Sequence, residues 1–113
     1  MTASSLGGRG EVSITPCYIP CRNDDALYRR FREIAGGILG PENVIEQEAP
    51  SMGCEDFSFF ADLVPSVYFS LGTGPAPGHA FAANHSDRFT INEDALSTGI
   101  LLHCAMILDY LNG

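Results

Sequence analysis

Several segments of the chain place apolar side chains at the spacing of an α-helix. The first such segment covers residues 25–39. Its apolar stripe consists of Leu27, Phe31, Ile34 and Ile38. Residues 54–63 and 94–111 follow the same period, and the last of these segments is apolar almost all round. A helix of that kind needs cover on more than one side, and the chain offers few elements to cover it.

Short runs of β-branched and aromatic residues predict strands between these helices. Residues 11–15 alternate between polar and apolar, as a half-buried strand does. Residues 44–47 and 67–71 are two further candidates, and the second reads as a buried strand. A strand, a loop, a helix and a strand within about 30 residues predict a parallel βαβ unit. The pattern therefore favours an α/β fold.

Composition and charge narrow the class of protein. A chain of 113 residues forms one domain at most, and its net charge of −8 disfavours nucleic acid as a partner. No unbroken apolar run reaches the ~18 residues of a membrane span, so we expect no membrane contact. Residues 1–10 are rich in Gly and Ser and should be flexible. The four cysteines are irregularly spaced, which predicts reduced thiols in a cytoplasmic protein.

Two loops flank the strand predicted at residues 67–71, and both contain groups that bind ligands. In the first, Gly53, Cys54, Glu55 and Asp56 stand at the start of a predicted helix. Free N–H groups there can bind an anion such as a carboxylate. The two acids can equally well serve only to complement the helix dipole.

The second loop, residues 72–90, is long, and loops of this length in a compact domain are usually functional. Its His85 is either an ordinary surface histidine or a metal ligand or proton carrier. His79 carries the same ambiguity with less support, and His103 reads as a packed histidine with a satisfied ring nitrogen. A Cys54–His85 nucleophilic pair is conceivable, but no residue is evident to orient the imidazole.

The motifs S-M-G-C-E-D-F-S-F-F, V-Y-F-S-L-G-T-G and N-H-S-D-R-F-T-I-N-E-D-A-L stand in this order along the chain. Together with C-Y-I-P-C-R-N-D, they resemble the C-terminal end of the metal-dependent amidohydrolase/aminoacylase family. This family includes hippurate hydrolases, auxin-conjugate hydrolases and related carboxypeptidases. The resemblance covers residues 11–113 and is specific when the motifs are taken together.

The resemblance implies a fold. Residues 11–20 would be a remnant of the last lid-domain strand and its linker, and residues 21–113 the C-terminal part of a larger catalytic domain. We therefore expect a partial three-layer sheet with the parallel βαβ unit and flanking helices. The family's remaining metal ligands and its glutamate base have no counterpart in this sequence.

The resemblance also implies site residues. His85 matches the family's final metal-ligand histidine, for a divalent zinc, manganese or cobalt ion. The remaining matches are substrate-binding Gly53, Cys54, Gly72, Thr73 and Gly74, with Glu55 and Asp56 in support. Cys54 replaces a usual Ser, and Asp87 replaces a Pro, which puts the rigidity of that loop in question.

The function implied is that of the C-terminal portion of a hydrolase that cleaves the amide bond of N-acyl amino acids or small peptides. No catalytic residue is expected in this segment, which alone should be inactive and hold no metal tightly. Its partner would be the missing N-terminal portion or a second copy of itself. The alternatives are a non-catalytic module that pairs with another chain and a small binding domain that kept the anion loop.

Overall fold

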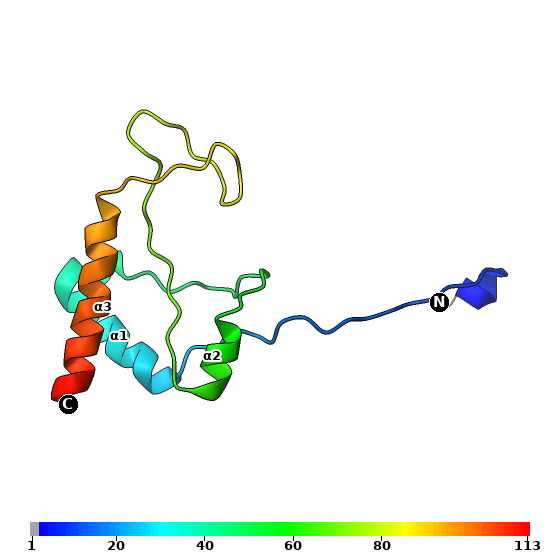
Figure 1. Ribbon diagram of the computed structural model, residues 1–113, viewed down its shortest axis with the longest axis horizontal. Coiled ribbons are helices and arrows are strands. Elements are labelled where there is room, and N and C mark those ends of the chain that lie inside the picture. Colours follow the sequence, from blue (N-terminus) through cyan, green and yellow to red (C-terminus); the bar gives the residue numbers. More distant parts are fainter. Residues whose placement is uncertain (1–2) are drawn as a thin grey trace.

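A computed structural model describes residues 3–113 as helices joined by long extended segments (Figure 1). The elements in chain order are η1 (Ala3–Leu6), α1 (Asp25–Leu39), η2 (Pro41–Asn43), α2 (Ser58–Leu63) and α3 (Ala95–Asn112). In Figure 1 the segment between η1 and α1 runs away from the rest of the chain.

α1 has the bounds that the sequence predicts, because both of its ends are set by local chemistry. The Asp24 side chain accepts hydrogen bonds from the backbone N–H groups of Ala26 and Leu27, at 3.0 and 2.8 Å. At the other end, Gly40 has φ +88°, a conformation that L side chains rarely adopt, and η2 follows directly. The predicted helix 25–39 is therefore confirmed.

The core lies where α1 crosses α3. Phe31 and Ala35 of α1 and Leu102 of α3 are its buried apolar residues. An ion pair closes one side of the crossing. Arg30 Nε donates to Asp109 Oδ2 at 2.8 Å, and Arg30 Nη2 donates to the other oxygen of the same carboxylate. The pair lowers the pKa of Asp109, chiefly through the hydrogen bond from Arg30.

The predicted sheet is wrong, because residues 3–113 contain no strand. The predicted strands at 11–15, 44–47 and 67–71 are extended segments without ladder partners, so neither the parallel βαβ unit nor a partial three-layer sheet is present. The predicted α/β class is therefore also wrong, because the described residues form a small helical fragment. A run of β-branched and aromatic residues favours extended backbone, but only a paired neighbour makes that backbone a strand.

Residues 67–71 nevertheless keep the alternation that suggested a strand. Val67 and Phe69 face the helical core, and the Phe69 ring stacks on that of Phe31 with centroids 4.6 Å apart. Tyr68 and Ser70 point outward and are exposed. The apolar side of the segment is therefore covered by α1 rather than by a sheet.

The structure is too open for an independent domain. Its accessible surface is 9642 Å², against about 6,000 Å² for a compact monomer of this mass. Its radius of gyration is 19.9 Å, against about 13 Å for a compact chain of this length. The extended residues 7–24 contribute to both differences, but the small core also leaves much of the helical part uncovered.

α3 is apolar on two opposite sides. One side, with Leu102 and Asp109, faces α1. The helical period places a second group on the opposite side, which we call the outer face of α3. It consists of Leu96, Ile100, Cys104, Ile107, Leu108 and Leu111. All of these residues are exposed.

By length and composition alone, α3 is also long and apolar enough to cross a membrane, with a mean hydropathy of 1.3. The sequence prediction counted unbroken apolar runs, and polar residues such as Ser97, His103 and Asp109 interrupt this helix. Its buried Leu102 and its ion pair with Arg30 show that one side of α3 packs against protein.

Candidate functional site

The loop around Gly53 and Cys54 precedes α2 rather than opening it. α2 begins at Ser58, so the predicted helix 54–63 is shorter at its N-terminus. The Gly53 N–H is taken by Ser51 Oγ at 3.2 Å, whereas the Cys54 N–H has no partner among the described residues. The predicted anion site at a helix start is therefore wrong in its geometry, and one exposed N–H group remains at Cys54.

Glu55 connects this loop to the extended segment 67–71. Tyr68 donates its hydroxyl to Glu55 Oε2 at 2.8 Å, and the Phe57 N–H donates to Glu55 Oε1 at 3.2 Å. The hydrogen bond from Tyr68 is the main cause that lowers the pKa of Glu55, and the same bond raises the pKa of Tyr68. Burial and, secondarily, the charge of Glu55 raise the pKa of the neighbouring Cys21 thiol.

The Asn23 side chain binds the backbone of Tyr68. Its side-chain amide accepts from the Tyr68 N–H at 2.7 Å and donates to the Tyr68 carbonyl at 3.0 Å. Both backbone groups of Tyr68 are thus paired as a neighbouring strand would pair them. The sequence reading missed Asn23 and Tyr68 as site residues. Tyr68 was predicted only as part of the strand at 67–71, and residues 45 apart in the sequence share no local pattern.

Two hydrogen bonds join the beginning of the second loop to its end. The Asn92 N–H donates to the Gly74 carbonyl at 3.1 Å, and the Ala76 N–H donates to Thr90 Oγ1 at 3.2 Å. Gly74 itself adopts φ +62°, and Thr73 Oγ1 bonds its carbonyl oxygen at 3.0 Å. The glycine turn 72–74 and the end of the loop therefore lie side by side.

His85 lies in this loop with its side chain exposed and its backbone at φ +67°. This left-handed conformation is uncommon outside glycine, although histidine adopts it more readily than most residues. A turn bond from the Ser86 N–H to the Ala83 carbonyl at 3.2 Å fixes it. Among residues 3–113 no group of three or more His, Cys, Asp or Glu side chains comes together, so this chain's residues alone do not fit a metal ion.

The structure does not bring all the predicted site residues together. Among the described residues, no hydrogen bond, ion pair or ring contact joins the Gly53–Cys54 loop to the loop that carries His85. Figure 1 shows the two loops apart. The Cys54–His85 nucleophilic pair therefore has no contact to support it. The predicted partner for a ring nitrogen of His103 is present, with Nδ1 2.8 Å from the Gly99 carbonyl oxygen, but His103 is exposed rather than packed.

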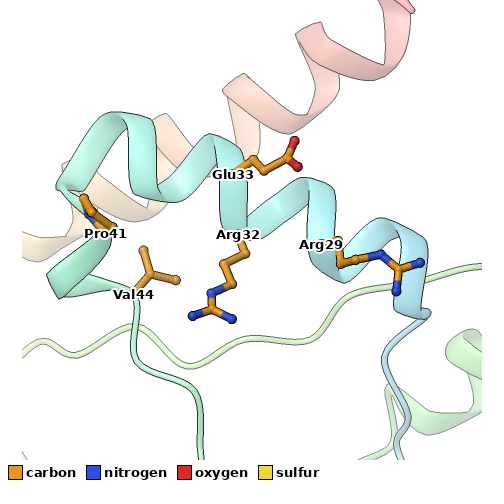
Figure 2. Close-up of a pocket in the computed structure, with 5 residues that line it drawn as sticks. All are labelled: Arg29, Arg32, Glu33, Pro41 and Val44. Atoms are coloured by element: carbon orange, nitrogen blue, oxygen red, sulfur yellow. The ribbon is translucent and has the colours of Figure 1, made fainter.

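A hollow of about 310 Å³ lies away from these loops, along α1 and η2. Figure 2 shows its lining residues, Arg29, Arg32, Glu33, Pro41 and Val44. Arg32 is paired with Glu46 at 3.1 Å and Glu33 with Arg30 at 3.0 Å, and the Glu33 side chain points away from the two lining arginines in Figure 2. Because the hollow lies away from both loops, we assign it no part in the site.

A model of the family described as "Peptidase family M20/M25/M40" matches residues 9–109, and the chain therefore belongs to this family. Members of the family are generally metal-dependent.

Several proteins are similar to this chain. It is 38% identical to "IAA-amino acid hydrolase ILR1-like 4" of Arabidopsis thaliana over 96 residues, which cover 85% of the chain and 22% of that protein. It is 39% identical to "IAA-amino acid hydrolase ILR1-like 2" of the same plant, over 81% of the chain and 20% of that protein. "Thermostable carboxypeptidase 2" of Saccharolobus solfataricus is 35% identical over 66% of the chain and 19% of its own length. The chain thus spans about a fifth of the relatives that it matches.

Proposed function

We propose that this chain is the C-terminal portion of an enzyme that hydrolyses the amide bond of N-acyl amino acids or small peptides. The observation that carries the proposal is the family match over residues 9–109, which includes both loops in their expected order. The relatives' names support this substrate class, since they are hydrolases of IAA–amino acid conjugates and carboxypeptidases.

In this proposal the two loops have separate roles. Cys54 and Gly53 lie on the wall that holds the substrate's carboxylate, where the exposed Cys54 N–H is free to donate. The turn formed by Gly72, Thr73 and Gly74 lies at the base of the loop that presents His85. Asp56 and Glu55 support the first loop.

His85 would be one of several ligands to a divalent zinc, manganese or cobalt ion. A catalytic metal takes about three protein ligands, so the others must come from outside this chain. When bound, such an ion polarises the substrate carbonyl as a Lewis acid. The chain alone should therefore have no amidase activity.

The rest of the enzyme would also cover the apolar surface that this chain leaves open. About four-fifths of each relative's length lies outside the match. The outer face of α3 is a continuous apolar stripe with nothing on it among the described residues. Exposed stripes of this size mark contacts with another protein surface, which here would be the remaining catalytic domain.

The test is a chimera in which this chain replaces the matching fifth of the Arabidopsis ILR1-like 4 hydrolase. We expect it to hydrolyse N-acyl amino acids in the presence of a divalent metal and to lose this activity in His85→Ala. His79→Ala is the matched control, because it removes a histidine from the same loop. Equal losses in both variants, or full activity in His85→Ala, would remove His85 from the site.

The second candidate function is a non-catalytic module that assembles with another chain. The exposed outer face of α3 is the observation that favours it. An inactive chimera, together with a purified chain that binds a separate protein through α3, would favour the module over the hydrolase portion.

A further inference from the structure

We propose that the hydrogen-bond relay from Asn23 through Tyr68 to Glu55 holds the Gly53–Cys54 loop in the conformation that receives the substrate's carboxylate. We call these residues the Asn23–Tyr68–Glu55 relay. Its substrate role rests on the proposed function, whereas its existence as a linked set of bonds does not.

The relay begins at the N-terminus of α1. Asn23 pairs both the N–H and the carbonyl of Tyr68, at 2.7 and 3.0 Å. The next residue reinforces the contact, because the Asp24 N–H donates to the Ser66 carbonyl at 2.9 Å. These bonds fix the height and rotation of the extended segment relative to α1, and therefore the direction in which the Tyr68 side chain leaves it.

From this fixed point the Tyr68 hydroxyl reaches Glu55, 13 residues away in sequence, at 2.8 Å. The ring of Tyr68 also packs against that of Phe57, with centroids 5.5 Å apart. The second oxygen of Glu55, Oε1, accepts a hydrogen bond from the Phe57 N–H at 3.2 Å. One oxygen of the Glu55 carboxylate thus ties the residue next to Cys54 to the segment 67–71, and the other closes a local turn at Phe57.

The charge of Glu55 makes it unsuitable for direct contact with the substrate. The bonds from Tyr68 and from the Phe57 N–H lower its pKa and keep it ionised. An ionised carboxylate repels the carboxylate of a substrate held at the neighbouring Cys54. The Tyr68 hydroxyl and the Phe57 N–H partly offset the charge on the Glu55 oxygens, so Tyr68 and Glu55 act as positioning residues rather than catalytic ones.

This arrangement predicts a specific kinetic effect in the chimera. Tyr68→Phe removes one hydroxyl and leaves the Glu55 carboxylate beside the binding loop without its bond to segment 67–71. We expect the KM for an N-acyl amino acid to rise about 3- to 10-fold, with kcat within about twofold, because a contact common to ground and transition states is weakened. The matching N-acyl amino acid amide, measured as a competitive inhibitor, lacks the carboxylate and should bind unchanged.

The control is Tyr110→Phe, which removes a hydroxyl from an exposed tyrosine of α3 and should change neither ligand. Equal losses for the acid and the amide in Tyr68→Phe would mean general damage to the fold, and no loss for either would mean that the relay has no role. Both results overturn the proposal.

A second measurement addresses the relay without any enzyme activity. Ultraviolet difference titration of the folded chimera, with and without Tyr68→Phe, isolates the ionisation of Tyr68. Glu55→Gln should bring that ionisation to lower pH, because Glu55 is the main cause that raises the pKa of Tyr68. An unchanged titration overturns the relay. An unsubstituted chimera without activity overturns the proposed function and the substrate role, while the titration still decides whether the relay exists.

Discussion

The outer face of α3 should make the isolated chain associate with itself. Ile100 and Ile107 stand seven residues apart on this face, which is two helical turns, and are 65% and 58% exposed. Because apolar residues on this face have no cover among residues 3–113, a second copy of α3 is the nearest surface that can bury them. The perturbation is the double substitution Ile100→Ser and Ile107→Ser.

The magnitude follows from the surface that remains to be buried. Fully burying an isoleucine side chain is worth about 1.5–3 kcal/mol, so the exposed part of each leaves about 1–2 kcal/mol. A symmetric dimer loses this contribution from both copies at both positions, which amounts to at least about 4 kcal/mol, or roughly a thousandfold in affinity. Serine and isoleucine have similar helix propensities, so the change should leave α3 itself intact.

Sedimentation equilibrium at micromolar concentration is the assay. The unsubstituted chain should associate, and the double variant should be monomeric over the same range. The control is Ile45→Ser with Met52→Ser, which removes two side chains of similar size that are 86% and 96% exposed in extended segments, away from any helical face. This control should associate as the unsubstituted chain does.

Two results would refute the reasoning. The first is a stable, cooperatively unfolding monomer of the unsubstituted chain with no apolar surface accessible to a dye. The second is a double variant that associates as tightly as the unsubstituted chain, which would place the contact elsewhere. In the chimera the same face should be covered, so the chimera should show no association that depends on Ile100 and Ile107.

Further outcomes follow from single contacts. His85 alone should hold zinc too weakly to survive gel filtration, since a stable site takes about four ligands; stoichiometric zinc in the isolated chain, lost in His85→Ala, would contradict this. The folded pKa of Asp109 is lowered, so its stabilisation is present above the ordinary pKa of 3.8 and is lost as pH falls below it. In Arg30→Gln, the free energy of unfolding of the chimera should therefore fall less steeply as the pH is lowered below about 4. An unchanged pH dependence would contradict a stabilising Arg30–Asp109 ion pair. Asp24→Ala should destabilise the chimera by about 1 kcal/mol in urea unfolding, whereas Asp24→Asn keeps the cap and should cost far less.

The helices were predictable because their ends are decided within a few residues. Asp24 caps α1 through its own neighbours, and Gly40 ends it by its backbone conformation. The start of α2 was mispredicted for a related reason. The Ser51 and Glu55 side chains bond the backbone at Gly53 and Phe57, and such bonds compete with helix formation.

The sheet and the relay were beyond the reach of sequence patterns because both depend on partners far along the chain. The alternation at residues 67–71 reports which side chains are buried, and Phe69 is indeed packed on Phe31. It does not report what the backbone pairs with, and here an asparagine side chain takes the place of a strand at Tyr68. The link from Tyr68 to Glu55 likewise joins two motifs that each look complete alone.

The Asn23–Asp24 dipeptide is the point at which the two halves of the candidate site meet. Asp24 caps α1 with its side chain and binds the Ser66 carbonyl with its N–H, while Asn23 binds Tyr68. Through the Tyr68 side chain this junction reaches the loop at Glu55, and the same extended segment continues into the Gly72–Gly74 turn. Two loops that share no direct contact are therefore oriented by one helix N-terminus.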